Sequence, residues 1–151
     1  MLRILLFGAP VMILCLVLQS IFVTIALRQY GRIRRRPGAL RSPWRNIALL
    51  AAIMLLVTIG SLLQVMIWAV LFFAIGEFDR LEPAIYYSAV NFSTLGYGDI
   101  VMSVRWRLLG PLEAFNGILM FGVSTAMMTA AVNLVIRQNA GARAAPGPPR
   151  D

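Results

Sequence analysis

A short run of residues, Thr94-Leu95-Gly96-Tyr97-Gly98-Asp99, offers a chemistry that depends on the main chain more than on side chains. Gly96 and Gly98 have no Cβ and tolerate backbone angles that most residues resist, so successive carbonyl oxygens can face the same way. Rings of such carbonyls can replace the water that an ion loses on entering a membrane. The Thr94 hydroxyl can add a further oxygen, and Tyr97 can brace the run from the side. The run therefore predicts a binding site for dehydrated cations.

The residues before this run predict a short helix that enters a membrane and turns back. Pro83 suits the start of a helix, and the stretch from Ala84 to Ser93 is mostly apolar and aromatic. A helix over 83–93 is about 17 Å long, too short to cross a hydrocarbon core of about 30 Å. Non-helical backbone at membrane depth is tolerated only where protein buries it or where it lines an aqueous path. We expect a pore helix over 83–93 and a filter over 94–99.

Three long uncharged runs surround these residues: 24 residues from Ile4 to Leu27, 30 from Asn46 to Ile75 and 23 from Ala114 to Ile136. A helix needs about 20 apolar residues to span the hydrocarbon core, and its backbone must satisfy its own hydrogen bonds there. The chain is 60% hydrophobic and only 13% charged, which is too little charge to cover a soluble surface. We predict an all-α membrane protein with three transmembrane helices.

The distribution of arginine predicts the orientation. All fourteen cationic residues are arginine, and seven of them lie between Arg28 and Arg45. Cytoplasmic loops carry excess positive charge, so the N-terminus is expected outside the cell and the C-terminus in the cytoplasm. A signal peptide would carry its charge before the apolar run rather than after it, so the first run is expected to be retained.

These observations divide the chain into four parts. They are an N-terminal transmembrane helix (1–27), an arginine-rich cytoplasmic loop (28–45), a pore domain (46–136) and a disordered cytoplasmic tail (137–151). Within the pore domain, the outer helix is expected over 46–75 and the inner helix over 106–136.

Composition argues against two other classes of protein. A net charge of +8 could suggest nucleic-acid binding, but the arginines form no basic stripe and no stacking platform accompanies them. The chain has no histidine, one cysteine (Cys15) within an apolar run, and no close carboxylate pair within a span. The usual acid–base and nucleophilic arrangements of enzymes are therefore missing. We predict no nucleic-acid partner, no catalysis and no cofactor, and we expect membrane lipids as the surroundings.

The run from Ser93 to Asp99 resembles the signature of the potassium channel superfamily, with leucine at 95 where valine or isoleucine is common. The resemblance covers Pro83–Asp99, and Gly117–Ala126 is similar to the inner helix of bacterial two-transmembrane channels. It implies a homotetramer in a cell membrane, of bacterial type, with one additional N-terminal helix. The resemblance also implies K⁺ coordination by four main-chain oxygens, those of Thr94, Leu95, Gly96 and Tyr97.

The same resemblance implies residues that support the filter. Asp99 is expected to bond to an aromatic residue of the pore helix, which the resemblance places at Tyr87. Val90 stands where some bacterial relatives carry glutamate, and Asn91 stands where threonine is typical. Asn91 either hydrogen-bonds behind the filter or is a satisfied packing amide.

The inner helix holds candidates for a hinge and for the lining of a cavity: Gly117, Ile118, Phe121, Gly122 and Thr125. Gly117 matches the hinge glycine of the family, but close helix packing explains a small residue equally well. For Gly122 we favour packing. Ile118 and Thr125 are seven residues apart and therefore share a helix face.

Two polar residues in or beside the apolar spans are further candidates. Glu113 lies near the outer end of the third span, where an acid is a functional candidate by default. We favour a structural role for it, such as a bond to the pore helix. For Gln64 in the second span, a polar contact between helices is the simplest interpretation.

Together these features predict a potassium-selective channel subunit for passive K⁺ conduction. Two alternatives stay open, a less selective cation channel on the same fold and a non-conducting membrane scaffold or modulatory subunit. Tyr97 argues against the first alternative, and the intact filter argues against the second. No span carries arginine at every third position, so a voltage-sensor helix is not expected.

Overall fold

The computed structural model describes residues 2–34 and 43–144, and the regular structure within them is entirely helical. The helices are α1 (Leu2–Arg34), α2 (Pro43–Ala74), α3 (Leu81–Phe92) and α4 (Leu109–Ala144). Three of them contain stretches long and apolar enough to cross a membrane, namely Leu6–Ala26, Trp44–Ala74 and Leu109–Arg137. The predicted all-α membrane fold with three spanning helices is confirmed.

The long helices extend beyond the uncharged runs from which they were predicted. α1 and α2 reach into the arginine-rich segment, and α4 continues to Ala144, so residues 137–144 of the predicted disordered tail are helical. Residues 35–42 of the predicted loop and 145–151 of the predicted tail lie outside the described residues. Arginine is a good helix former with a side chain long enough to reach water, so a charge need not end a helix.

α3 begins at Leu81, two residues before the predicted start, so Pro83 is its third residue. The first four N–H groups of a helix have no intrahelical partner, so proline costs no hydrogen bond at that position either. The helix has 12 residues and ends at Phe92. It is therefore far too short to span, as predicted.

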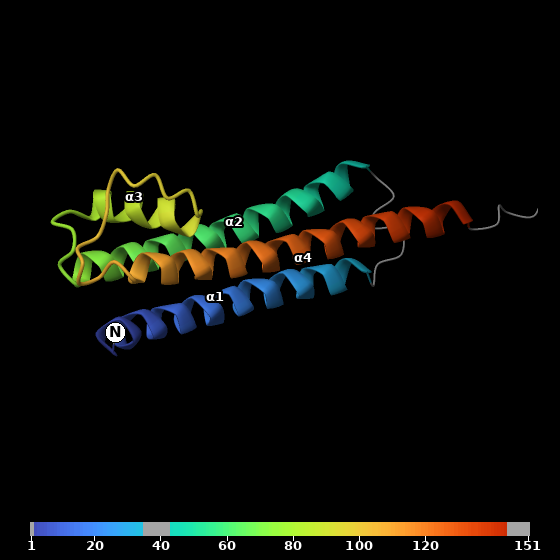
Figure 1. The fold of residues 1–151 in the computed structure, drawn as a ribbon. Helices are drawn as coiled ribbons and strands as arrows, with labels where there is room; N and C mark the ends of the chain where they lie inside the picture. Colours follow the sequence, from blue (N-terminus) through green and yellow to red (C-terminus); the bar gives the residue numbers. More distant parts are fainter. Residues whose placement is uncertain (1, 35–42, 145–151) are drawn as a thin grey trace, which may run out of the picture.

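α2 and α4 form the centre of the bundle (Figure 1). α1 and α3 each pack against both of them, whereas α1 and α3 have no contact with each other among the described residues. The ring of Tyr87 on α3 lies 5.5 Å, centroid to centroid, from the rings of both Phe72 and Phe78. This aromatic cluster fixes α3 against the end of α2.

The two ends of the bundle differ. The start of α1, the helix α3 and the loop that follows α3 lie together at one end (Figure 1). Acidic residues gather in the loops of this end: Glu77, Asp79 and Asp99. The opposite end holds a smaller apolar cluster of Leu49, Ile53 and Ala131, which joins α2 to α4.

Candidate functional site

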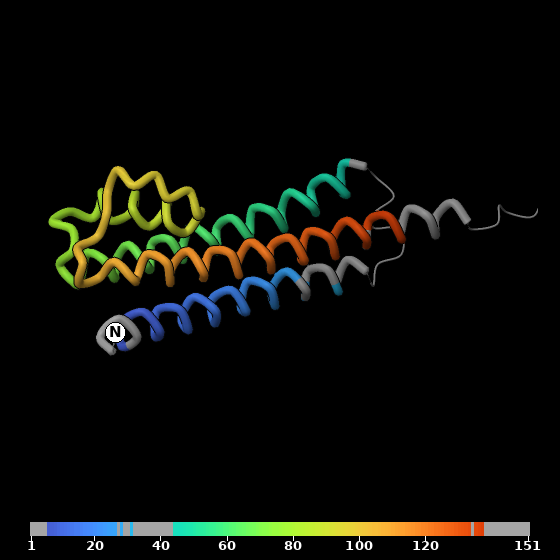
Figure 2. The backbone as a smooth tube through the Cα atoms, viewed as in Figure 1, coloured from blue at the N-terminus to red at the C-terminus, as the bar shows by residue number. Residues whose placement is uncertain are grey.

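The chain leaves α3 by turning back onto the end of that helix. The N–H of Thr94 donates to the carbonyl of Asn91 at 2.8 Å, and the N–H of Leu95 donates to the carbonyl of Val90 at 3.0 Å. The last carbonyls of a helix have no partner inside it, so these bonds satisfy groups that would otherwise be unpaired. From there the chain runs back beside α3 toward the start of α4 (Figure 2).

The backbone of residues 94–98 alternates in handedness. Thr94, Gly96 and Gly98 have φ values of 61°, 57° and 75°, whereas Leu95 and Tyr97 between them do not have positive φ. In an ordinary strand successive residues present opposite faces. Alternating left- and right-handed residues instead turn successive carbonyls toward the same side. A filter built from backbone carbonyls requires this arrangement.

Thr94 is the unusual member of this series. A β-branched residue with positive φ is an outlier, and such a conformation costs about 1–3 kcal/mol. The hydrogen bonds of Thr94 and Leu95 to the end of α3 hold the backbone in this conformation. Strain of this kind concentrates at functional sites. The two glycines made the angles at 96 and 98 foreseeable, but nothing in the residue type indicated a third left-handed residue at 94.

The side chains of the run are open to the surroundings in the single chain. Leu95 is 58% exposed and Tyr97 is 65% exposed. Exposed apolar groups of this size, next to each other, are typical of an interaction surface. Tyr97 therefore does not brace the run against helices of its own chain.

Asp99 has a different aromatic partner from the predicted one. The hydroxyl of Tyr86 donates to Asp99 Oδ2 at 2.6 Å, whereas Tyr87 is buried against Phe72 and Phe78. Consecutive residues of a helix point about 100° apart, so a shift of one residue exchanges an outward ring for a buried one. The Tyr86 hydrogen bond holds the pKa of Asp99 below its ordinary value. The prediction that Tyr87 holds Asp99 was wrong by one residue.

Val90 and Asn91 contact the run 94–99 through their main-chain carbonyls. The carbonyl of Val90 accepts from the N–H of Leu95 and, at 3.2 Å, from the hydroxyl of Ser93. The Val90 side chain is buried and brings no polar group behind the filter. Asn91 Nδ2 donates to the carbonyl of Tyr87 at 3.0 Å, so its amide is satisfied within α3. This contact favours the packing interpretation of Asn91.

A contact between two loops was missed by the sequence analysis. Glu77 accepts hydrogen bonds from both the backbone N–H and the hydroxyl of Ser103, the latter at 2.9 Å. Glu77 follows α2, and Ser103 lies between the filter and α4. The pair therefore ties the segment after the filter to the end of α2. The two residues are 26 positions apart, and no local pattern marks such a pair.

Gly117 lies where α4 comes closest to α3. A Cβ at this position would lie 2.0 Å from the carbonyl oxygen of Phe92, so only glycine permits the approach. The structure therefore favours close packing for Gly117. Gly122 has no described atom within 4 Å of the position of its absent Cβ, so its predicted packing has no counterpart within the chain.

The other candidates on α4 lie on an open face beside the filter end of α3. Ile118 is 57% exposed and Phe121 is 46% exposed, and Thr125 is also exposed. The Phe121 ring lies 6.1 Å from the ring of Phe92, the last residue of α3. This face of α4 is therefore continuous with the filter rather than with the core of the bundle.

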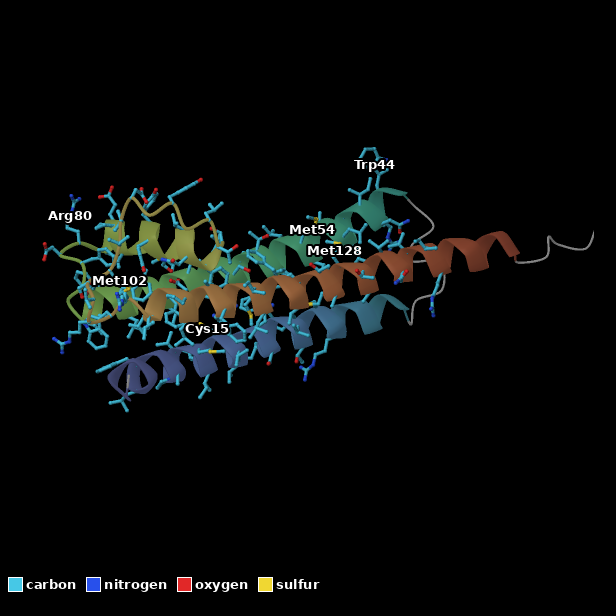
Figure 3. All side chains as sticks on the ribbon, viewed as in Figure 1. Cys15, Trp44, Met54, Arg80, Met102 and Met128 are labelled. Carbon is cyan, nitrogen blue, oxygen red and sulfur yellow. The ribbon has the colours of Figure 1, made fainter. Side chains whose placement is uncertain are left out.

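Glu113 and Gln64 both take structural roles in the core. Glu113 is fully buried and contacts the hydroxyl of Ser88 on α3, and Gln64 Nε2 donates to Gln19 Oε1 on α1 at 2.9 Å. Cys15, labelled in Figure 3, is fully buried in the same region. The sequence pointed to Glu113 and Gln64, but it did not identify their partners.

The helices and the run described above lie largely within a segment that matches a known protein family. Residues 60–133, about half of the chain, match the model of a family described as ion channel. The matched segment contains the last part of α2 from Gly60, all of α3, the run 94–99 and most of α4. Neither the curated proteins nor the solved structures gave a match. Through this segment, the chain is a membrane-embedded member of the ion channel family.

Proposed function

We propose that the chain is one subunit of a potassium-selective channel that conducts K⁺ passively through a ring of four copies. The alternating sign of φ at 94–98 carries the proposal, because such alternation would turn the carbonyls of Thr94, Leu95, Gly96 and Tyr97 toward one side of the chain. A dehydrated ion needs oxygens around its whole surface. One copy supplies them from one direction only, so a closed symmetric ring is required.

The exposed apolar residues around the filter support assembly. Leu95 and Tyr97 on the run and Ile118 and Phe121 on α4 are each at least 46% exposed in the single chain. Neighbouring copies would cover the Tyr97 ring and supply the brace that the single chain lacks. The open face of α4 with Thr125 would then line a cavity below the filter.

The distribution of charge would favour cations in that cavity and supports one orientation in the membrane. α3 ends at Phe92 beside the start of the filter, and a helix C-terminus carries about half a negative charge. The acidic end of the bundle would form the outer mouth, in the cell membrane. The other end carries Arg28, Arg45 and Arg137 and would face the cytoplasm together with the C-terminus.

Flux measurements on the purified chain in liposomes test the proposal. We expect K⁺ flux under a potassium gradient and at most about a hundredth of that flux under a matched sodium gradient, because filter carbonyls discriminate between the two ions. Equal flux of both ions would indicate the less selective cation channel instead. No flux of either ion would indicate a non-conducting scaffold or modulatory subunit.

The variant Gly96→Ala tests the filter assignment directly. Gly96 has a φ of 57°, and an alanine there costs about 1–2 kcal/mol and displaces the carbonyls. We expect loss of K⁺-selective flux. Gly31→Ala is the matched control, because Gly31 lies in helix α1 with no described atom within 4 Å of its absent Cβ. A K⁺ to Na⁺ flux ratio that is unchanged in Gly96→Ala would contradict the assignment.

A further inference from the structure

Five polar side chains are buried together in the middle of the bundle. They come from all four helices and are named here the buried polar cluster: Gln19 from α1, Gln64 from α2, Ser88 from α3, and Glu113 and Asn116 from α4. Gln19 is 3% exposed and the other four have no exposed surface. Burying such groups is costly unless they are hydrogen-bonded, and polar residues inside membrane spans mark functional positions.

Three amides of this cluster form a hydrogen-bonded chain from α4 through α2 to α1. Asn116 Nδ2 donates to Gln64 Oε1 at 3.4 Å, and Gln64 Nε2 donates to Gln19 Oε1 at 2.9 Å. Gln19 Nε2 and Asn116 Oδ1 are buried and have no partner in the described part of the chain. The same amides would use these two atoms if every donor direction were reversed. In either direction the amide chain joins α4, α2 and α1 by side-chain hydrogen bonds inside the bundle.

The cluster continues from the amide chain to the pore helix. Glu113 precedes Asn116 by about one turn of α4, so both side chains lie on the same side of that helix. The hydroxyl of Ser88 on α3 contacts Glu113 Oε1 and, at 2.8 Å, the carbonyl of Val65 on α2. α3 is thus held to α2 and α4 at the level of the amide chain. The same short helix ends where the filter begins.

α1 influences α3 only through α2 and α4, since α1 and α3 have no contact with each other among the described residues. Gln19 is the residue of α1 that belongs to the amide chain. The hydroxyls of Ser20 and Thr24, which are exposed on the outer side of α1, bond instead to carbonyls of their own helix. Gln19 is therefore the amide of α1 that hydrogen-bonds into the amide chain.

We propose that Gln19 is a positioning residue for the filter. Through the amide chain, α1 sets the placement of α3, and a displacement of α1 changes the ion selectivity of the run 94–99. The proposal rests on the function proposed above for that run. It gives the first helix, which lies outside the segment that matches the ion channel family, a part in the selectivity of the pore.

Hydrogen exchange of the full chain in lipid nanodiscs, together with liposome flux, tests the link. Gln19→Leu removes the amide and keeps most of the volume, and Gln19→Met serves if the leucine variant folds poorly. We expect the amides of residues 88–93 to exchange about tenfold faster in the variant, as the loss of one buried hydrogen bond predicts. We also expect the K⁺ to Na⁺ flux ratio to fall by about fivefold, a typical size for coupling between sites.

Two further variants separate a positioning role from a merely structural one. Thr24→Val removes a polar group from the exposed side of the same helix and is expected to leave both readouts within about twofold of the wild type. With Gln64→Leu already present, Gln19→Leu should add less than about twofold, because the link is already broken. Unchanged exchange at 88–93 in Gln19→Leu, or additive effects in the double variant, would overturn the proposal. Exchange does not require conduction, so it decides the link even if the wild type carries no K⁺.

Discussion

The run 94–98 and the buried polar cluster differ in the kind of polar groups they contain and in how deeply those groups are buried. The run, residues 94–98, uses backbone carbonyls, is exposed in the single chain and depends on left-handed residues. The cluster uses side-chain amides and hydroxyls, is buried and sits on regular helices. In the proposed function the run offers its carbonyl oxygens to an ion, whereas the cluster bonds most of its polar atoms to each other. Substitutions in the run should therefore alter ion handling before stability, and substitutions in the cluster should alter stability first.

The largest effect is expected where the two regions meet, at Gly117. Gly117→Ala places a methyl group against the carbonyl of Phe92, so α4 must move away from the end of α3. We expect a loss of about 3 kcal/mol in stability together with loss of flux. Thermal unfolding in detergent and liposome flux measure the two effects.

Gly122→Ala is the matched control on the same helix, since a Cβ there meets open space. We expect its thermal midpoint to stay at or slightly above the wild-type value, because alanine favours the helix. Equal midpoints for the two variants would show that the approach of α4 to Phe92 is not a constraint.

A smaller effect is expected inside the cluster, at Ser88. Ser88→Ala leaves Glu113 and the Val65 carbonyl without their hydroxyl partner, so we expect about 2 kcal/mol of destabilisation. Ser93→Ala, on a half-buried hydroxyl that bonds to the carbonyl of Ala89, should cost less than about 0.5 kcal/mol. Thermal unfolding compares the two. If both variants lost the same stability, burial would not distinguish the cluster from the filter.

The smallest effect is expected at the outer edge of the filter. The Tyr86 hydrogen bond lowers the folded-state pKa of Asp99, so its contribution is complete above pH 3.8 and is lost as the pH falls through the lowered value. In Tyr86→Phe the pKa of Asp99 should rise toward 3.8, with little change in unfolding temperature because both groups are exposed. Carboxyl NMR titration of Asp99 measures the shift.

Tyr87→Phe is the control for this titration. The Tyr87 ring is buried among aromatic side chains and does not bond to Asp99, so its loss of the hydroxyl should leave the titration of Asp99 unchanged. If the pKa of Asp99 shifted in Tyr87→Phe and not in Tyr86→Phe, Tyr87 would be the partner of Asp99, as the sequence predicted.

The sequence predicted what depends on local patterns. Long apolar runs define the spanning helices, and the glycines at 96 and 98 foretold a backbone with unusual angles. The sequence analysis assigned Tyr87 rather than Tyr86 as the partner of Asp99. Which ring faces Asp99 depends on the rotation of α3 about its axis, and packing against α2 sets that rotation. For Glu113 the bond to the pore helix was predicted but the residue Ser88 was not, and the partner of Gln64 was missed, since contacts between helices depend on their relative rotation and depth. Side chains that pair across helices leave no periodic signal in one sequence.

Gly117 also has a mechanical consequence. The contact with Phe92 holds α4 near its start, and the helix continues from there to Ala144. At about 1.5 Å per residue, the part beyond the contact is a lever arm of about 40 Å. If the cluster of Leu49, Ile53 and Ala131 opened, a swing of about 10° around that point would move the far end by about 7 Å while the end of α3 stayed still. A small angular motion near Phe92 would thus become a displacement wider than an ion at the far end of α4.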